Sequence, residues 1–87
     1  MFEFEENLIR PVQVQELLHC SKTVLYDWVD EGLLTPPFKI GKRATAWPTD
    51  ELKRILAARI AGASELEIKV LVAKMLIERK AQYKSEA

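Results

Sequence analysis

The stretch from Leu18 to Leu34, LHCSKTVLYDWVDEGLL, decides the fold because it contains the corner between two predicted helices. Ser21 is a good N-cap, since its hydroxyl oxygen can accept a hydrogen bond from a backbone N–H of the next turn. Gly32 follows where a left-handed residue is needed to end a helix. The stretch therefore predicts a helix over about residues 22–31, with an inward apolar stripe formed by Val24, Leu25, Trp28 and Val29.

The same stretch contains the only histidine and the only cysteine of the chain, adjacent at His19 and Cys20. A structural zinc site needs about four Cys or His ligands, and a nucleophilic thiol needs a base that a third group positions. Because the sequence supplies neither set, we expect no metal site, no cofactor and no enzymatic activity. Cys20 is expected to be a small buried apolar residue at the helix corner, with His19 partly exposed.

The flanking elements follow from similar signals. Pro11 suits the first turn of a helix, which the apolar spacing extends over about residues 11–18 after a short strand near residues 8–9. Pro36-Pro37 forbids helix, and alternation on both sides of the turn Gly41-Lys42-Arg43 predicts a small β-hairpin over residues 38–47.

Two further helices are expected after the hairpin. Thr49 or Asp50 is predicted to cap a third helix that ends near Gly62. Ser64 and Glu67 have the spacing of a capping box, which predicts a fourth helix over about residues 65–83.

The chain is short and electrically neutral, with 87 residues, 13 Lys and Arg, and 13 Asp and Glu. This length suits one small domain, and no apolar run approaches the roughly 20 residues of a membrane span. A single cysteine cannot form an internal disulfide and fits a reducing compartment. The acidic N-terminus does not resemble a secretory signal, so we expect a soluble cytoplasmic protein with no membrane partner.

The charge is unevenly distributed along this neutral chain. Residues 1–20 contain one Arg and four Glu, a net charge of −3, whereas the three segments 21–47, 48–63 and 64–87 each sum to +1. Neutrality overall argues against an indiscriminate nucleic-acid binder. The stretch from Lys39 to Arg43 nevertheless holds three cations and no acid, which predicts a local basic patch.

A short helix, a tight turn and a second helix form a helix-turn-helix, whose second helix enters the major groove of DNA. A two-helix corner alone is a weak signal, because many helical folds contain one. A basic hairpin directly after it is the arrangement of a winged helix-turn-helix, in which the wing contacts the DNA backbone or minor groove. The alternative is an ordinary solvated turn. The candidate DNA contacts are Ser21, Lys22, Thr23 and Tyr26 on the recognition helix and Lys39, Lys42, Arg43 and Thr45 on the wing.

Residues 8–62 resemble the AlpA family of prophage and genomic-island regulators, which are winged helix-turn-helix proteins of the broader MerR and excisionase-like group. The resemblance implies a mainly α fold with a small β-hairpin wing, an α+β class, over residues 1–62, to which residues 63–87 add a C-terminal helix. The blocks that carry it are Ser21–Tyr26, Glu31–Leu33, Pro37–Arg43 with Trp47, and Leu52–Arg59.

The resemblance implies DNA binding at an attachment site or promoter. Such a protein acts as an excisionase, that is a recombination directionality factor working with an integrase, or as a transcriptional regulator of the integrase gene. It also implies that Trp47 anchors the wing to the core. Three features depart from the pattern: Asp27 stands where a basic residue is common, Val24 stands where Thr is common, and the acidic lead-in Glu3, Glu5 and Glu6 must lie away from DNA.

Residues 64–87 extend past the resemblance and have two apolar arcs on a helical wheel. Leu66, Val70, Ala73 and Ile77 form the first arc. Ile68, Leu71, Val72, Met75 and Leu76 form the second. Packing on one domain needs only one arc, so the pattern suggests a homodimer, with the second arc as the candidate surface. The alternative is that the domain covers both arcs.

A different class of function stays open on the sequence alone. A small helical adaptor that binds another protein through this tail, without binding DNA, would also be electrically neutral. DNA binding at low salt, where nonspecific affinity is strongest, separates the two functions.

Overall fold

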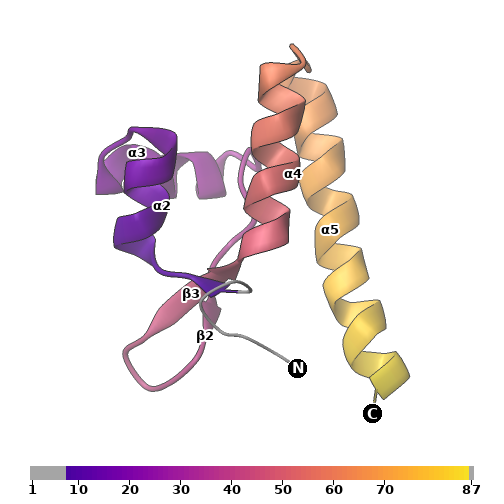
Figure 1. The fold of residues 1–87 in the computed structure, drawn as a ribbon. Helices are drawn as coiled ribbons and strands as arrows, with labels where there is room; N and C mark the ends of the chain where they lie inside the picture. Colours follow the sequence, from indigo (N-terminus) through magenta and orange to yellow (C-terminus); the bar gives the residue numbers. More distant parts are fainter. Residues whose placement is uncertain (1–7, 87) are drawn as a thin grey trace.

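The computed structural model describes residues 8–86, which form four helices and a small three-stranded antiparallel sheet (Figure 1). This confirms the expected α+β class, and each predicted element is present within a few residues of its expected bounds. In chain order the elements are β1 (Leu8–Ile9), α2 (Pro11–Leu18), α3 (Lys22–Asp30), β2 (Phe38–Lys39), β3 (Thr45–Pro48), α4 (Thr49–Ile60) and α5 (Glu65–Glu86).

Local hydrogen bonds explain where α3 and α5 begin. The Ser21 hydroxyl accepts from the backbone N–H of Val24 at 3.2 Å, as predicted for an N-cap. Before α5, Ser64 and Glu67 form the predicted capping box: the Ser64 N–H donates to Glu67 Oε1 at 2.9 Å, and the Glu67 N–H donates to Ser64 Oγ at 3.2 Å. After α3, Gly32 has a φ of 79°, the left-handed conformation expected there.

The predicted cap of α4 is wrong. Neither Thr49 nor Asp50 caps the helix, because α4 begins at Thr49 itself and Pro48 occupies the N-cap position without a side-chain hydrogen bond. Pro48 is also the last residue of β3, where it pairs with Leu8, so the strand runs directly into the helix. Thr49 is consequently already helical, and its hydroxyl oxygen is buried without a hydrogen-bond partner among the described residues.

Strand β3 is the centre of the sheet, between β1 and β2. Its Trp47 pairs with Ile9 of β1, and on the other side its Thr45 pairs with Lys39 of β2. Beyond the paired residues, the Ile40 N–H donates to the Ala44 carbonyl at 2.9 Å, which closes the hairpin around residues 41–43.

The core lies where α2, α3, α4 and α5 meet around Trp47. Its buried members are Val14, Leu25, Leu33, Leu34, Trp47, Leu52, Ile55, Ile68, Val72 and Met75. The apolar stripe predicted for α3 is only partly correct, because Leu25 is fully buried whereas Val24 is 38% exposed. Val24 lies in the first turn of α3, beside the cap, and not in the interface with the other helices.

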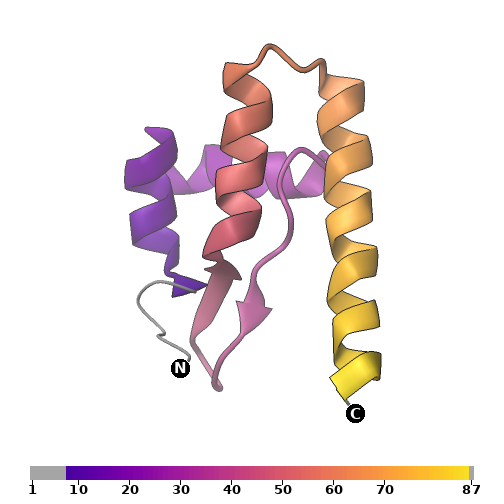
Figure 2. The ribbon, with the colours of Figure 1, turned by 45° about the vertical axis from the view of Figure 1, so that its right-hand side comes forward.

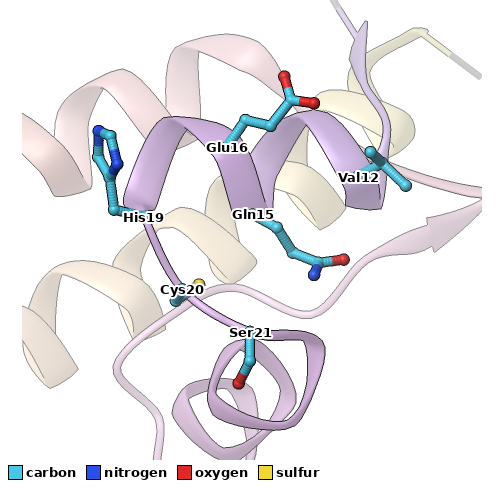
Figure 3. A pocket seen from close by; sticks show the side chains of 6 residues that line it. All are labelled: Val12, Gln15, Glu16, His19, Cys20 and Ser21. Atoms are coloured by element: carbon cyan, nitrogen blue, oxygen red, sulfur yellow. The ribbon is translucent and has the colours of Figure 1, made fainter.

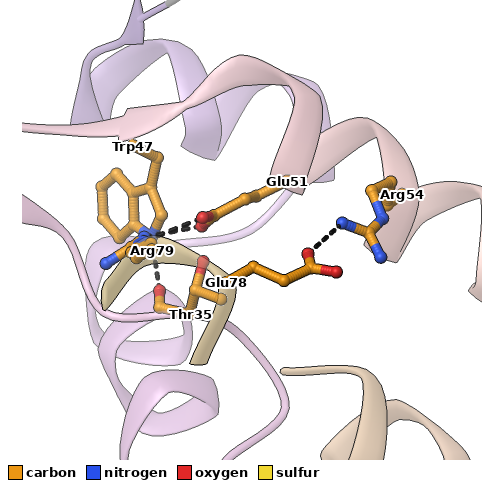
Figure 4. A network of polar contacts seen from close by, with 6 residues as sticks. All are labelled: Thr35, Trp47, Glu51, Arg54, Glu78 and Arg79. Atoms are coloured by element: carbon orange, nitrogen blue, oxygen red, sulfur yellow. Dashed lines mark hydrogen bonds and ion pairs between the residues drawn. The ribbon is translucent and has the colours of Figure 1, made fainter. Parts of the chain in front are cut away.

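Helix α5 packs alongside α4 and lies at the edge of the molecule, at the opposite side from α2 (Figures 1 and 2). Two ion pairs also join these helices: Arg79 makes a bidentate contact with Glu51 at 2.6 and 2.8 Å, and Arg54 contacts Glu78 at 2.8 Å (Figure 4). Although α5 has 22 residues, no helix among residues 8–86 is long and apolar enough to cross a membrane.

The prediction of which arc of α5 forms the dimer surface is wrong. The arc proposed for a second copy faces the chain's own core: Ile68, Val72 and Met75 are buried there, and Leu71 and Leu76 are half-buried against it. These side chains belong to the same buried cluster as Trp47, on the side of α5 that packs on α4, so they are not available to a partner. The arc left in solvent is the other one, formed by Leu66, Val70, Ala73 and Ile77.

Candidate nucleic-acid interface

The corner between α2 and α3 is tight because His19 adopts a left-handed conformation, with φ of 52°. The N–H of Cys20 donates to the Gln15 carbonyl at 3.1 Å, so the chain turns immediately after α2. A shallow open groove follows this corner, and Figure 3 shows the residues that line it: Val12, Gln15, Glu16, His19, Cys20 and Ser21.

The side chains of His19 and Cys20 point in different directions from this corner (Figure 3). His19 is exposed, whereas Cys20 is half-buried and packs against the core. Burial raises the pKa of the Cys20 thiol, which favours the protonated form over the nucleophilic thiolate. Within residues 8–86, no three His, Cys, Asp or Glu side chains gather in a way that could hold a metal ion.

The start of α3 presents the first group of predicted DNA-contact residues. Ser21, Lys22 and Thr23 are all exposed. The Ser21 hydroxyl oxygen accepts the Val24 N–H, while the amides of Lys22 and Thr23 have no acceptor within the helix because they belong to its first turn. No acidic residue lies in that turn, so the positive end of the helix dipole is open to an anion.

Tyr26 lies differently from the outward position expected for it. Its side chain is half-buried, and its ring centroid is 6.2 Å from that of Trp47, with the ring planes inclined at 51°. The sequence pattern missed this contact because Tyr26 is outside the apolar stripe read from helix phase. The amphipathic character of tyrosine, an apolar ring with a polar tip, was the available signal.

Trp47 is fully buried, and its indole N–H donates to the backbone carbonyl of Thr35 (Figure 4). Trp47 therefore ties β3 to the loop before β2 as well as to α3. This geometry confirms that Trp47 anchors the hairpin to the core.

The hairpin presents the second group of predicted residues. Lys39 and Thr45 are directly opposite each other across β2 and β3, so their side chains share one face of the hairpin. The same face of β3 carries Trp47 two residues later, because side chains alternate along a strand. Lys42 and Arg43 are exposed in the loop that closes the hairpin. The Tyr26–Trp47 contact thus connects α3 with the strand that carries the hairpin.

The exposed cations of the two groups lie outside the ion pairs of the described residues, as do Lys53, Lys69 and Lys80 elsewhere, which are also exposed. Both ion pairs found among residues 8–86 join α4 to α5, and Arg59 lies over the Trp28 ring at 5.2 Å. The exposed cations of α3 and the hairpin enter neither kind of contact. They are Lys22, Lys39, Lys42 and Arg43.

Asp27 is the main electrostatic complication at this surface. It is exposed and lies one helical turn after Thr23, on the same face of α3. A carboxylate at that place repels phosphate, but it can accept a hydrogen bond from a cytosine amine. Asp30 and Glu31 at the end of α3 are exposed as well, and the acidic lead-in residues Glu3, Glu5 and Glu6 lie outside the described residues.

Comparisons with protein-family models, curated protein sequences and solved structures found no match to this chain.

Proposed function

We propose that this chain binds double-stranded DNA as a winged helix-turn-helix protein, with α3 as the recognition helix and the β2–β3 hairpin as the wing. The observation that carries the proposal is a set of four exposed cations, without ion-pair partners in the described structure, on α3 and the hairpin. They are joined through the Tyr26–Trp47 contact. Exposed cations that no ion pair neutralises are available to the phosphates of a DNA backbone.

Each element has a distinct part in the proposed complex. Ser21, Lys22 and Thr23 enter the major groove at the start of α3, where side chains reach base edges and free amides reach a phosphate. Asp27, one turn further, selects a base that offers a hydrogen-bond donor. The Tyr26 ring is held by Trp47, so only its hydroxyl is available to DNA.

The wing supplies the contacts that do not depend on sequence. Lys42 and Arg43 in its loop, with Lys39 on its face, bind phosphates, and Thr45 beside Lys39 adds a neutral hydrogen bond. If Lys22 and these three cations each neutralise one phosphate, the logarithm of the association constant falls with the logarithm of salt concentration with a slope of roughly −3.6.

The resemblance to the AlpA family extends the proposal to the biological output. In that setting the protein is an excisionase that works with an integrase at attachment-site DNA, or a regulator of integrase transcription. Both outputs use the same contacts. Binding to repeated sites beside an attachment site, with bending of that DNA, supports excision, whereas binding at a promoter alone supports regulation.

The test begins with selection of fragments from genomic DNA by the purified protein, followed by sequencing and titration of the enriched fragment at several salt concentrations. Arg43→Ala is expected to weaken binding to all sequences and to reduce the salt slope by about one. Lys53→Ala removes an exposed cation from α4, outside both proposed surfaces, and is the matched control, for which affinity and slope stay unchanged.

An adaptor without DNA binding is the competing function, and the same titration separates it. Absence of binding at low salt, where the phosphate attraction is greatest, would contradict the DNA proposal. Equal effects of Arg43→Ala and Lys53→Ala would contradict the assignment of the wing while leaving DNA binding itself in place.

A further inference from the structure

The face of α5 that points away from the core carries large apolar side chains in solvent. Leu66, Val70 and Ile77 are 71%, 61% and 69% exposed, and Ala73 between them is exposed as well. A shallow apolar groove runs along this face, lined by Leu66, Val70 and Leu71, with the charged residues Glu67 and Lys74 beside it. Contiguous apolar surface of this kind usually marks an interaction site.

The spacing of this face is that of one side of a two-helix coiled coil. Leu66, Val70, Ala73 and Ile77 are separated by four, three and four residues, which is the alternation of the a and d positions in a heptad. The opposite face of α5 is already buried through Ile68, Val72 and Met75. Since α5 lies at the edge of the molecule (Figure 2), the free face is open to another helix.

We propose that this face pairs with the same face of a second copy of the chain, the two α5 helices running antiparallel. With the two-fold axis midway between positions 71 and 72, Leu66 meets the second copy's Ile77, and Val70 meets the second copy's Ala73. Each of these facing pairs then joins an a position of one helix to a d position of the other. The small Ala73 lets the helices approach closely at the centre. A surface that is complementary to itself in this way forms a closed two-fold dimer.

Charge supports a second copy and selects the antiparallel direction. In the antiparallel arrangement Glu67 flanks the seam beside the second copy's Lys74, and the symmetry repeats this attractive pair. A parallel arrangement would instead place Lys69 beside the second copy's Lys74, which is a repulsion between like charges. Glu67 uses Oε1 in the capping box, which leaves its other carboxylate oxygen for Lys74.

The proposed interface is short, and this sets the expected affinity. From Leu66 to Ile77 the seam covers about three helical turns, or roughly 17 Å. Because even interfaces of standard size range from micromolar to picomolar dissociation constants, we expect a reversible dimer with a dissociation constant on the order of micromolar. The inference does not depend on DNA binding, so it is tested without DNA.

The experiment is sedimentation equilibrium of the full chain from about 1 to about 200 µM. We expect an equilibrium between a 10.0 kDa monomer and a species of twice that mass. Val70→Glu places a charge in the seam and is expected to weaken association more than about a hundredfold. Because Val70 is exposed in the monomer, the midpoint of thermal unfolding of the Val70→Glu monomer stays unchanged. A 10.0 kDa species alone at every concentration would overturn the proposal and leave this face to another occupant.

Charge variants test the orientation. Glu67→Gln removes the charge but keeps a residue that can form a capping box, so it should weaken the dimer. Lys74→Glu replaces attraction with repulsion and should weaken the dimer roughly fivefold. Lys69→Glu is the matched control: it leaves an antiparallel dimer unchanged but would strengthen a parallel one. The proposed arrangement is contradicted if Lys69→Glu lowers the dissociation constant of the dimer, or if Val70→Glu leaves that constant unchanged.

Discussion

The ring centroids of Tyr26 and Trp47 lie 6.2 Å apart, with the ring planes inclined at 51°. This contact joins α3 to the central strand of the sheet. Trp47 is fully buried and also donates to the Thr35 carbonyl. The Tyr26–Trp47 contact therefore links α3 to the hairpin, alongside the pairing of β3 with β1. Because Tyr26 takes part in this contact and is also a proposed DNA contact, changes at Tyr26 separate structural effects from effects on DNA.

Tyr26→Phe should leave the unfolding free energy within about 1 kcal/mol of the original, because the ring contact is kept. If the hydroxyl bonds to DNA, affinity should decrease about three- to tenfold, the value of one hydrogen bond. Tyr26→Leu is the control that removes the aromatic contact and should reduce stability. Urea unfolding and fluorescence anisotropy on one DNA fragment measure the two effects. Unchanged affinity for Tyr26→Phe would remove Tyr26 from the proposed contacts.

The two ion pairs between α4 and α5 should differ greatly in their contribution. Glu51 is 6% exposed, so Arg79→Ala leaves a buried carboxylate without its partner and should cost about 2–3 kcal/mol. The Arg54 and Glu78 side chains are 40% and 49% exposed, so Arg54→Ala should cost less than about 1 kcal/mol. Urea unfolding at neutral pH gives both values. Equal losses of unfolding free energy in the two variants would show that the burial of Glu51 does not determine the contribution of its ion pair.

Thr35 is fully buried, and its hydroxyl oxygen has no hydrogen-bond partner among the described residues. Thr35→Val replaces that hydroxyl with a methyl group and keeps the backbone carbonyl that accepts from Trp47. We expect unchanged or increased stability, by up to about 1 kcal/mol. Thr35→Ser keeps the hydroxyl but deletes a methyl group, so it should destabilise by about 1 kcal/mol. Destabilisation by Thr35→Val would indicate a hydrogen bond to that hydroxyl.

Acid should weaken the α5 side of the molecule through two carboxylates. Hydrogen bonds from the backbone and hydroxyl of Ser64 lower the pKa of Glu67 from its ordinary value of 4.5, and the hydrogen bond from Arg54 lowers the pKa of Glu78. In both cases the unfolded chain binds protons first as the pH falls. The stabilisation is therefore complete above about pH 4.5 and is lost as the pH falls through the folded pKa values.

This pH dependence is measured by urea unfolding between pH 7 and pH 3, together with NMR titration of the carboxyl groups. Glu67→Gln is the control, since it can keep the capping box but no longer titrates. It should flatten part of the pH dependence below about pH 4.5. A stability that rises as the pH falls through this window would contradict the assignment.

The two proposals together predict the form of the DNA site. A two-fold dimer presents two copies of α3 related by symmetry, so the enriched fragments should contain inverted pairs of half-sites. Val70→Glu should abolish the preference for paired half-sites while a single half-site is still bound. Direct repeats as the preferred site would argue for separate monomers on DNA, even if the free protein dimerises.

Much of this fold was predictable from local signals in the chain. Ser21 as a cap, the capping box of Ser64 with Glu67, the left-handed Gly32 and the strand–turn–strand pattern around Gly41 each depend on residues within a few positions of one another. Their outcome follows from backbone hydrogen bonding and steric preference. The exposed cations of the hairpin are also a property of the sequence, since Lys42 and Arg43 occupy its loop.

Only the tertiary structure decided which apolar surfaces became core. Helix α5 has apolar residues on two arcs, and periodicity cannot say which arc meets the domain. Packing on α4 and the rest of the core buried Ile68, Val72 and Met75, and left Leu66, Val70 and Ile77 in solvent. Tyr26 likewise turned inward because a distant strand brought Trp47 to it. The cap of α4 differed because Pro48 was already paired with Leu8, some 40 positions earlier. In each case the deciding neighbour is far away in sequence, so the interaction exists only once the elements have packed.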